Sequence, residues 1–425
     1  MKLLIKNGTI INANSKTRLK ADVLIEDNKI KKIGKNINKT GYKKIDANGK
    51  WVLPGLIDLH AHLRQPGGES KETIKTGTRA AARGGVTTLF CMPNTNLPID
   101  NALTVEYIQL KAQKEGIVNV YPVGAITKGR TGEELAEIGA LVKAGVKAIS
   151  DDGSPVMNAE VMKIALEYAK LFDIPVISHC EDIHLANSGV MNSGYVSTML
   201  GLSGISRASE DVMVGRDIIL AEVTGGHIHI AHISTAGSVE LVRAAKKRKV
   251  KVTCETCPHY FTLTEEAVVG YDTNMKMNPP LRTKNDLKAI VRGIKDGTID
   301  CISTDHAPHT KDEKNQEFDF APFGIIGLET MLSLAYEELV LKNKISFEKV
   351  LCRLTVKPAE IMKLDTKGKI KEEFDADIIV FDPKKRWVVD DNLESKSRNT
   401  PFMGQELMGT VDYTIVSGNI VWKQK

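Results

Sequence analysis

The sequence predicts an α/β protein that combines a (β/α)8 TIM barrel with a small β-sandwich domain built from the two chain ends. Two observations support this fold class. The middle of the chain alternates short apolar runs with amphipathic helical patterns, as in successive βαβ units. The ends instead carry short strand-like runs separated by turn residues, and neither end has enough apolar residues for its own core. We therefore expect residues 1–52 and 365–425 to form one composite domain and residues 53–364 to form the barrel.

Eight strand candidates can be read in the middle of the chain. They lie at residues 55–60, 86–92, 118–123, 146–150, 175–179, 228–232, 251–254 and 300–304. Eight such units within about 300 residues fit a closed barrel better than an open sheet. No G-x-G-x-x-G follows the first strand to indicate a dinucleotide site. In a barrel of this kind the active site lies at the carboxyl ends of the strands, so the polar residues there are the candidates for function.

Charge and cysteine usage exclude several classes of protein. A formal net charge of +5 over 425 residues is too small for a typical nucleic-acid-binding domain. The N-terminus does not resemble a signal peptide, and no stretch is long and apolar enough to span a bilayer. We therefore expect a cytoplasmic protein with reduced thiols. Cys254 and Cys257 form a C-x-x-C, but a structural zinc site needs a second pair of ligands, so we interpret them as buried, inert thiols.

The first barrel strand ends in Asp58-Leu59-His60-Ala61-His62. Because residues two apart in an extended chain share a face, we expect Asp58, His60 and His62 to point toward the barrel axis. Leu59 and Ala61 would then point toward the helices. Two imidazoles converging from one strand suit a borderline-soft cation such as zinc.

Other strand ends on the same rim carry further histidines and aspartates. They are Asp151, Asp152, His179, His232 and Asp305. Burying so many titratable groups together is costly unless a metal neutralises them. Four histidines and at least two aspartates exceed the needs of one tetrahedral zinc with an open position. The set therefore predicts two metal ions, which together would activate a water molecule and polarise a carbonyl.

These strand ends lie within longer motifs by which the chain resembles the amidohydrolase superfamily and, within it, the class I dihydroorotases. The motifs are residues 54–64, 91–95, 150–153 and 303–309, and the resemblance covers essentially the whole chain. It implies reversible, zinc-dependent hydrolysis of the cyclic amide of (S)-dihydroorotate to N-carbamoyl-L-aspartate, a step of pyrimidine biosynthesis. It also implies a small-molecule substrate and a homodimer, and it leaves association with aspartate transcarbamoylase open.

The resemblance further implies a role for each member of the donor set. His60 and His62 would bind one zinc and His179 and His232 the other, Asp152 would bridge them, and Asp305 would touch the first zinc and act as general base and acid. Hydantoinases and allantoinases of the superfamily carry a carboxylated lysine at the bridging position, and this chain departs from that pattern.

The bridging position itself is open between Asp151 and Asp152. Ala148 and Ser150 are small and in phase with Asp152, which favours Asp152 in a crowded barrel interior. Lys147 alternates onto the opposite face of the strand, so it is not expected to replace the aspartate.

Substrate recognition is predicted from charge. Dihydroorotate carries a ring carboxylate, and the guanidinium of Arg64, two residues after His62, offers a bidentate match to it. The resemblance implies further contacts from His62, Asn94, Asn278, His309, Phe323 and Gly324. Asn94 and Asn278 can also be read as turn residues, and Arg64 as a surface residue without a ligand. The charged segment 311–320 is either a loop that moves over the site or an ordinary exposed loop.

Two rival functions would also use this fold. One is a related enzyme that opens a hydantoin or allantoin ring, and the absent bridging lysine together with Arg64 and Asn94 argues against it. The other is a non-catalytic scaffold, and the presence of all six proposed metal ligands argues against that.

Overall fold

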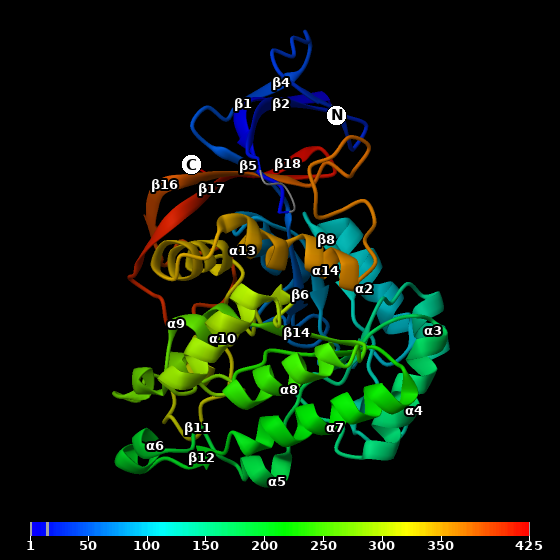
Figure 1. Ribbon diagram of the computed structural model, residues 1–425, viewed down its shortest axis with the longest axis vertical. Helices are drawn as coiled ribbons and strands as arrows, with labels where there is room; N and C mark the ends of the chain where they lie inside the picture. The colour runs from blue at the N-terminus through cyan, green and yellow to red at the C-terminus, as the bar shows by residue number, and fades with distance from the viewer. Residues whose placement is uncertain (1, 14–16, 425) are drawn as a thin grey trace.

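Strands from both chain ends share one sheet. The computed structural model describes residues 2–13 and 17–424. The sheet runs in the order β18-β17-β16-β5-β1-β2-β3, with β4 also paired to β1. Its strands are β1 (Lys2–Ile10), β2 (Leu19–Glu26), β3 (Lys29–Gly34), β4 (Lys43–Asp46), β5 (Trp51–Pro54), β16 (Ile378–Val388), β17 (Glu406–Val416) and β18 (Asn419–Lys423). β5 joins the two ends because it pairs with β1 on one side and with β16 on the other, at the top of Figure 1.

All eight strand candidates of the middle region are confirmed as parallel strands. They are β6 (Leu56–Ala61), β7 (Val86–Cys91), β8 (Asn119–Pro122), β9 (Ile149–Ser150), β10 (Val176–Ser178), β13 (Ile228–Ile230), β14 (Val252–Thr256) and β15 (Cys301–Ile302). The first three form one sheet and the other five a second. Parallel bridges between Gly124 and Ile149 and between Ala61 and His306 link these sheets at both edges. The carboxyl ends of neighbouring strands therefore meet on one rim.

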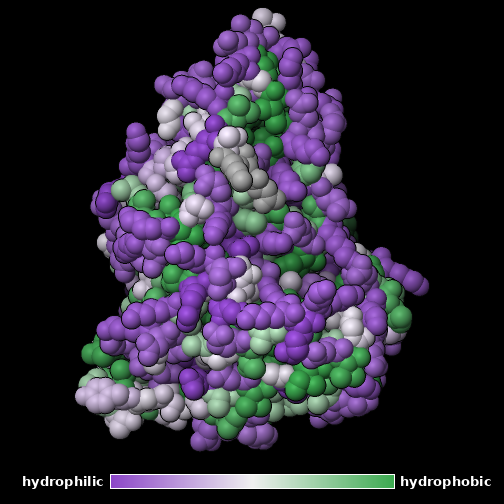
Figure 2. All heavy atoms as spheres, viewed as in Figure 1, coloured by the Kyte–Doolittle hydropathy of each residue, from purple (hydrophilic) through white to green (hydrophobic). Residues whose placement is uncertain are grey.

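Helices cover the outside of the parallel strands (Figure 1). The longer ones are α1 (Ile74–Arg83), α2 (Ala102–Glu115), α4 (Ala159–Leu171), α7 (Ala208–Thr224), α8 (Ala236–Lys247), α10 (Lys284–Asp296) and α13 (Phe347–Leu354). The shorter ones are α3 (Ile138–Lys143), α5 (Ile183–Ala186), α6 (Tyr195–Leu200), α9 (Pro258–Thr262), α11 (Lys311–Lys314), α12 (Met331–Leu334) and α14 (Val356–Ile361). A short strand pair, β11 (Met191–Asn192) with β12 (Gly204–Ile205), lies near α6. The outward face shown in Figure 2 is mostly hydrophilic.

Local sequence explains where key helices begin. α1 starts after Thr73, whose hydroxyl accepts a hydrogen bond from the Thr76 backbone N–H. In return, the Thr76 hydroxyl accepts one from the Thr73 backbone N–H. The same reciprocal cap is made by Thr283 and Asp286 at α10. Such caps satisfy backbone donors that the first turn leaves unpaired. Within the residues that the structure describes, no helix combines the length and apolar character needed to cross a membrane.

Candidate metal centre and active site

The two histidines at the end of β6 meet two aspartates from other strand ends. His60 Nε2 lies 3.3 Å from Asp152 Oδ1 and 3.6 Å from Asp305 Oδ1. His62 Nε2 lies 3.4 Å from Asp152 Oδ2 and 3.1 Å from Asp305 Oδ1. Each carboxylate therefore faces both imidazoles.

His179 and His232 complete the cluster around Asp152. His179 Nδ1 lies 2.9 Å from His232 Nε2, and these nitrogens are 3.8 and 3.5 Å from Asp152 Oδ1. His232, which follows β13, has a positive φ of 30°, a strained conformation that turns the chain at the rim. The fold thus brings together all six predicted donors, with Asp152 between the two histidine pairs.

The donor set fits bound metal. His60 Nε2 and Asp152 Oδ1 are buried atoms without a hydrogen-bond partner. A buried polar atom without a partner costs free energy that a metal ion would recover. Two groups of three side chains offer ligand atoms within 4.8 Å of one another, namely His60 with Asp152 and His232, and His60 with His62 and Asp305. Imidazole nitrogens and carboxylate oxygens are ligands that zinc accepts.

Asp152, and not its neighbour, points into this cluster. Asp151 instead accepts hydrogen bonds from the backbone N–H groups of Ile126 and Thr127, at 2.8 and 3.1 Å, and from the Thr127 hydroxyl. Its carboxylate is therefore occupied in holding a loop. Lys147, as expected, is directed elsewhere, with Nζ 6.0 Å from the centre of the Tyr121 ring.

Neighbouring side chains fix the orientation of the histidine rings. Nδ1 of His60 lies 2.8 Å from Glu255 Oε1, and Nδ1 of His62 lies 2.7 Å from Asn94 Oδ1. Both partners can accept a hydrogen bond, so a metal-bound ring would carry its proton on Nδ1 and present the lone pair of Nε2 to the metal. His179 is arranged the other way, because its Nε2 lies 3.1 Å from Glu181 Oε2 and its Nδ1 faces Asp152.

Sequence reasoning missed Glu255 and Glu181. Glu255 is fully buried in β14, one residue beyond the predicted strand 251–254, and it also lies 3.3 Å from His229 Nε2. Glu181 lies two residues after His179. Both stand at strand ends, which is the signal that could have found them.

The cluster keeps its carboxylates ionised. Burial alone would raise the pKa of Asp305, but the charge on His60 and the hydrogen bond from His62 lower it to about 2. Burial likewise opposes ionisation of Glu255, yet hydrogen bonds from His229 and His60 bring its pKa well below the usual range. For His62 burial dominates and lowers the pKa, which favours the neutral ring that a metal requires.

Asp58 requires a correction. Strict alternation placed it on the face of His60 and His62, but its carboxylate accepts from the Thr304 N–H and hydroxyl and from the His60 N–H. Likewise Leu59, expected to point toward the helices, belongs to the same buried cluster as Ile57. The pairing of β6 with β7 shifts register on both sides of Asp58, and such a shift breaks the period of two.

A cavity of about 230 Å³ opens beside the cluster. It is lined by His62, Arg64, Asn94, Asp152, Gly153, His179, His232, Asn278, Asp305, Ala307, His309, Phe323 and Gly324. All the side chains predicted to contact a substrate therefore line one cavity. His60, which is fully buried, is the member of the predicted site that does not line it.

Arg64 and His309 form the polar end of this cavity. Arg64 Nε donates to the Pro308 carbonyl at 3.1 Å, and a positive φ of 59° turns its side chain at the end of β6. His309 Nε2 donates to the Phe323 carbonyl at 2.8 Å. Burial and the charge of Arg64 lower the pKa of His309 to about 3, so the ring is neutral and Arg64 is the cation here. Asn278 Nδ2 donates to Glu181 at 3.0 Å.

The segment 311–320 is partly helical and is tied to the wall of the cavity. It begins with α11, and Lys314 Nζ donates to the carbonyls of Pro322 and Gly324 at 2.9 and 3.1 Å. Phe318 is buried. Seven of the ten residues are nevertheless exposed, so the exposed loop and the loop that moves over the site both stay predictions.

Cys254 and Cys257 are free and buried, as expected for inert thiols. Burial raises the pKa of Cys254 to about 12, so its thiolate is not formed at neutral pH.

Solved structures share this fold over the full chain. A dihydropyrimidinase from Brevibacillus agri NCHU1002 matches with a TM-score of 0.86 and 25% identity, over 100% of this chain and 95% of that one. An L-hydantoinase from Arthrobacter aurescens matches with a TM-score of 0.89 and 22% identity, over 99% and 96% of the two chains. The architecture is thus of the mixed α/β type found in these enzymes.

Sequence comparison identifies the family. Residues 49–238 match a family model described as dihydro-orotase-like, and residues 224–422 match one described as amidohydrolase family. A dihydroorotase of Endomicrobium trichonymphae is 55% identical over 424 residues, covering 100% of both chains. A dihydroorotase of Thermoanaerobacter sp. strain X514 is 54% identical over 425 residues, covering 100% of this chain and 98% of the relative. Since these matches span the whole chain, including every residue of the cluster, the chain belongs to the dihydroorotase family of the amidohydrolases.

Proposed function

We propose that this chain is a zinc-dependent dihydroorotase that reversibly hydrolyses the ring amide of (S)-dihydroorotate to N-carbamoyl-L-aspartate. The observation that carries the proposal is the single cavity that joins a buried histidine–carboxylate cluster to the guanidinium of Arg64. A cyclic amide that carries a carboxylate needs both features. The cluster would act on the reacting carbonyl, and the guanidinium would bind the negative charge of the carboxylate. The dihydroorotases of similar sequence support the same substrate.

The metal would be held by the six predicted donors. His60, His62 and Asp305 would bind one zinc, His179 and His232 the other, and Asp152 would contact both, as its place between the histidine pairs supports. Bound zinc supplies a Lewis acid for the carbonyl and lowers the pKa of water. Imidazole and carboxylate are ligands that zinc accepts, and zinc is the metal we propose for this donor set.

Side chains of the cavity would carry out proton transfer and substrate binding. Asp305 is ionised and lines the cavity, so it can accept a proton from the attacking water and return it to the leaving ring nitrogen. Arg64, with Asn94 and His309 beside it, would hold the ring carboxylate and so align the amide with Asp305. Asn278, Phe323 and Gly324, which line the same cavity, would contact the ring.

Replacing Arg64 by methionine is expected to raise KM for dihydroorotate about 10–100-fold, because a hydrogen bond to a charged group contributes about 1.5–3 kcal/mol. Steady-state kinetics with dihydroorotate measure this. Arg79→Met on α1 is the matched control, since Arg79 is exposed and pairs with Glu394 away from the cavity. An unchanged KM in Arg64→Met would show that Arg64 does not bind the carboxylate.

The substrate is tested by incubating the zinc-loaded protein with dihydroorotate, hydantoin and allantoin. Ring opening of dihydroorotate is expected to be the fastest by far, and chelation of the metal should abolish it. Activity confined to hydantoin or allantoin would instead identify a different cyclic amidohydrolase. Absence of stoichiometric zinc and of all three activities would favour a non-catalytic scaffold.

The proposal extends to architecture and assembly. We infer a closed (β/α)8 barrel over residues 53–364, supported by the two bridges that join the parallel sheets at both edges. A composite β-domain of residues 1–52 and 365–425 is supported by the sheet that both ends share, and its sandwich form stays a prediction. The homodimer and the cytoplasmic location stay predictions, and association with aspartate transcarbamoylase stays open.

A further inference from the structure

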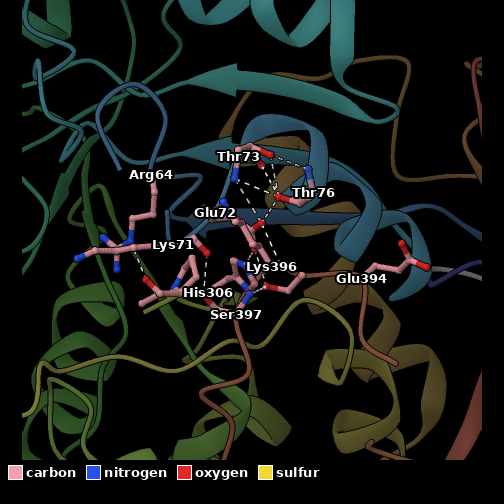
Figure 3. A network of polar contacts seen from close by, with 12 residues as sticks. Arg64, Lys71, Glu72, Thr73, Thr76, His306, Glu394, Lys396 and Ser397 are labelled. Carbon is pink, nitrogen blue, oxygen red and sulfur yellow. Dashed lines mark hydrogen bonds and ion pairs between the residues drawn. The ribbon is translucent and has the colours of Figure 1, made fainter. Parts of the chain in front are cut away.

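Glu72 is a fully buried carboxylate that the proposed mechanism does not use. It precedes α1 and lies at the centre of the polar network in Figure 3. Its exposed fraction is 0%. Oε1 accepts from the Thr76 hydroxyl and, at 3.2 Å, from the Lys396 N–H, while Oε2 accepts from the Ser395 hydroxyl. A buried charge satisfied by so many donors is held in one place, and it links α1 to the segment after β16.

The Thr73 N–H also donates to Glu72 Oε1, at 3.3 Å, and a further partner of Glu72 is His306, the residue after Asp305. His306 Nε2 lies 3.3 Å from Glu72 Oε2, and His306 Nδ1 accepts from the Gly327 N–H at 3.2 Å. Because Nδ1 is the acceptor, the ring proton lies on Nε2 and is donated to Glu72. The network therefore fixes the tautomer and the orientation of this ring.

The backbone of His306 is connected to the metal cluster on both sides. Its carbonyl accepts from the His62 N–H at 2.8 Å, and its own N–H donates to the Thr304 hydroxyl at 3.1 Å. Between Thr304 and His306, Asp305 has a φ of 47°, in the left-handed region that disfavours side chains. Such a conformation costs about 1–3 kcal/mol and persists only where its surroundings impose it.

Two buried carboxylates thus hold the two neighbours of Asp305. Asp58 accepts from the Thr304 N–H at 3.1 Å on one side, and Glu72 accepts from the His306 ring on the other. Within residues 2–13 and 17–424, neither carboxylate belongs to the groups that could hold a metal.

We propose that Glu72 is a positioning residue that acts through His306 to hold Asp305, and the His62 backbone beside it, in the conformation that the metal cluster requires. The inference rests on the proposed function for its kinetic consequence, but the placement of the metal ligands can be measured without any substrate. Removing the acceptor would leave the His306 ring free to turn and would relax the imposed conformation at Asp305.

The test uses the full chain and compares Glu72→Gln with two substitutions of His306. The asparagine of His306→Asn can still accept from the Gly327 N–H, but it is too short to donate to Glu72. The glutamine of His306→Gln is one methylene longer and can still donate to Glu72. Glu329→Gln is the matched control, because Glu329 is also a buried carboxylate that accepts from backbone N–H groups, those of Glu394 and Ser395, without a hydrogen bond to His306.

Glu72→Gln and His306→Asn are each expected to lower kcat for dihydroorotate about 10-fold or more while KM changes less than about 2-fold. The double variant Glu72→Gln/His306→Asn should have a kcat no lower than that of either single variant, since both substitutions disrupt the same Glu72–His306 hydrogen bond. His306→Gln should retain more activity than His306→Asn. Glu329→Gln should lose stability without this change in kcat.

Cobalt titration supplies a readout independent of the reaction. In both Glu72→Gln and His306→Asn, one cobalt ion should bind about 10-fold more weakly than in the wild type, with an altered visible spectrum. Wild-type affinity and spectrum in both variants, or kinetic effects equal to those of Glu329→Gln, would overturn the inference. If Glu72→Gln does not fold, His306→Asn carries the test. A wild-type protein that binds cobalt but does not open dihydroorotate would refute the function and leave the cobalt comparison valid.

Discussion

Replacing Asp305 by asparagine is expected to lower kcat for dihydroorotate about 10²–10⁴-fold, the usual contribution of a positioned general acid–base group. Asparagine has nearly the same shape and keeps an oxygen toward His62, but it cannot accept a proton from water or return one to the leaving nitrogen. The loss should fall on kcat more than on KM, because Arg64 and not Asp305 is expected to hold the substrate charge. Steady-state kinetics in both reaction directions measure it.

The metal content of the Asp305→Asn protein must be measured alongside, because the same carboxylate lies 3.1 Å from a proposed ligand nitrogen. Asp300→Asn is a suitable control, because Asp300 immediately precedes the amino end of β15, whereas Asp305 follows its carboxyl end. Asp300 pairs with Lys246 there. That variant should lose stability but keep kcat. Near-normal turnover by a fully metallated Asp305→Asn protein would show that the acid–base role is wrong.

The second large effect is expected at Asp152. Asp152→Asn should lower metal affinity at least about 100-fold and abolish most activity, because one carboxylate facing both histidine pairs is replaced by a neutral amide. Elemental analysis after dialysis and isothermal titration with zinc measure the loss. The result would also settle which of the two neighbouring aspartates lies between the metals.

Asp151→Asn is the matched variant, one residue away and equally buried. It should keep its metal but lower the free energy of unfolding by about 1–3 kcal/mol, because the loop donors at Ile126 and Thr127 lose their charged acceptor. Urea unfolding measures this difference. Loss of metal in Asp151→Asn, with full retention in Asp152→Asn, would reverse the assignment.

Much of the candidate site could be predicted because its residues stand at strand ends. A strand places its last side chains on the same rim as those of every other parallel strand, so His60, His179 and Asp305 could be grouped without any knowledge of distance. The role of Arg64 in binding the substrate carboxylate could be predicted from its spacing after His62 and from the charge of the expected ligand. The parallel strands themselves follow from apolar runs, which depend on local composition.

The prediction for Asp58 was wrong because a register shift is not visible in local alternation. Glu255 and Glu72 were not identified because their partners are remote in sequence: His60 lies 195 residues from Glu255, and His306 lies 234 residues from Glu72. Hydrogen bonds of this kind depend on how strands and helices are arranged in space, and single-sequence patterns carry no record of that arrangement.

The sequence by itself therefore determined the parallel strands, the rim on which the chemistry lies, and the four histidines with Asp305 and Arg64, because these depend on period, order and residue type. Only the tertiary structure decided that Asp152 and not Asp151 faces the histidines, that Glu255, Asn94 and Glu181 orient the rings, and that Glu72 reaches Asp305 through His306. Those outcomes depend on which donor and acceptor come within about 3 Å of each other after folding, and packing of distant segments sets that distance.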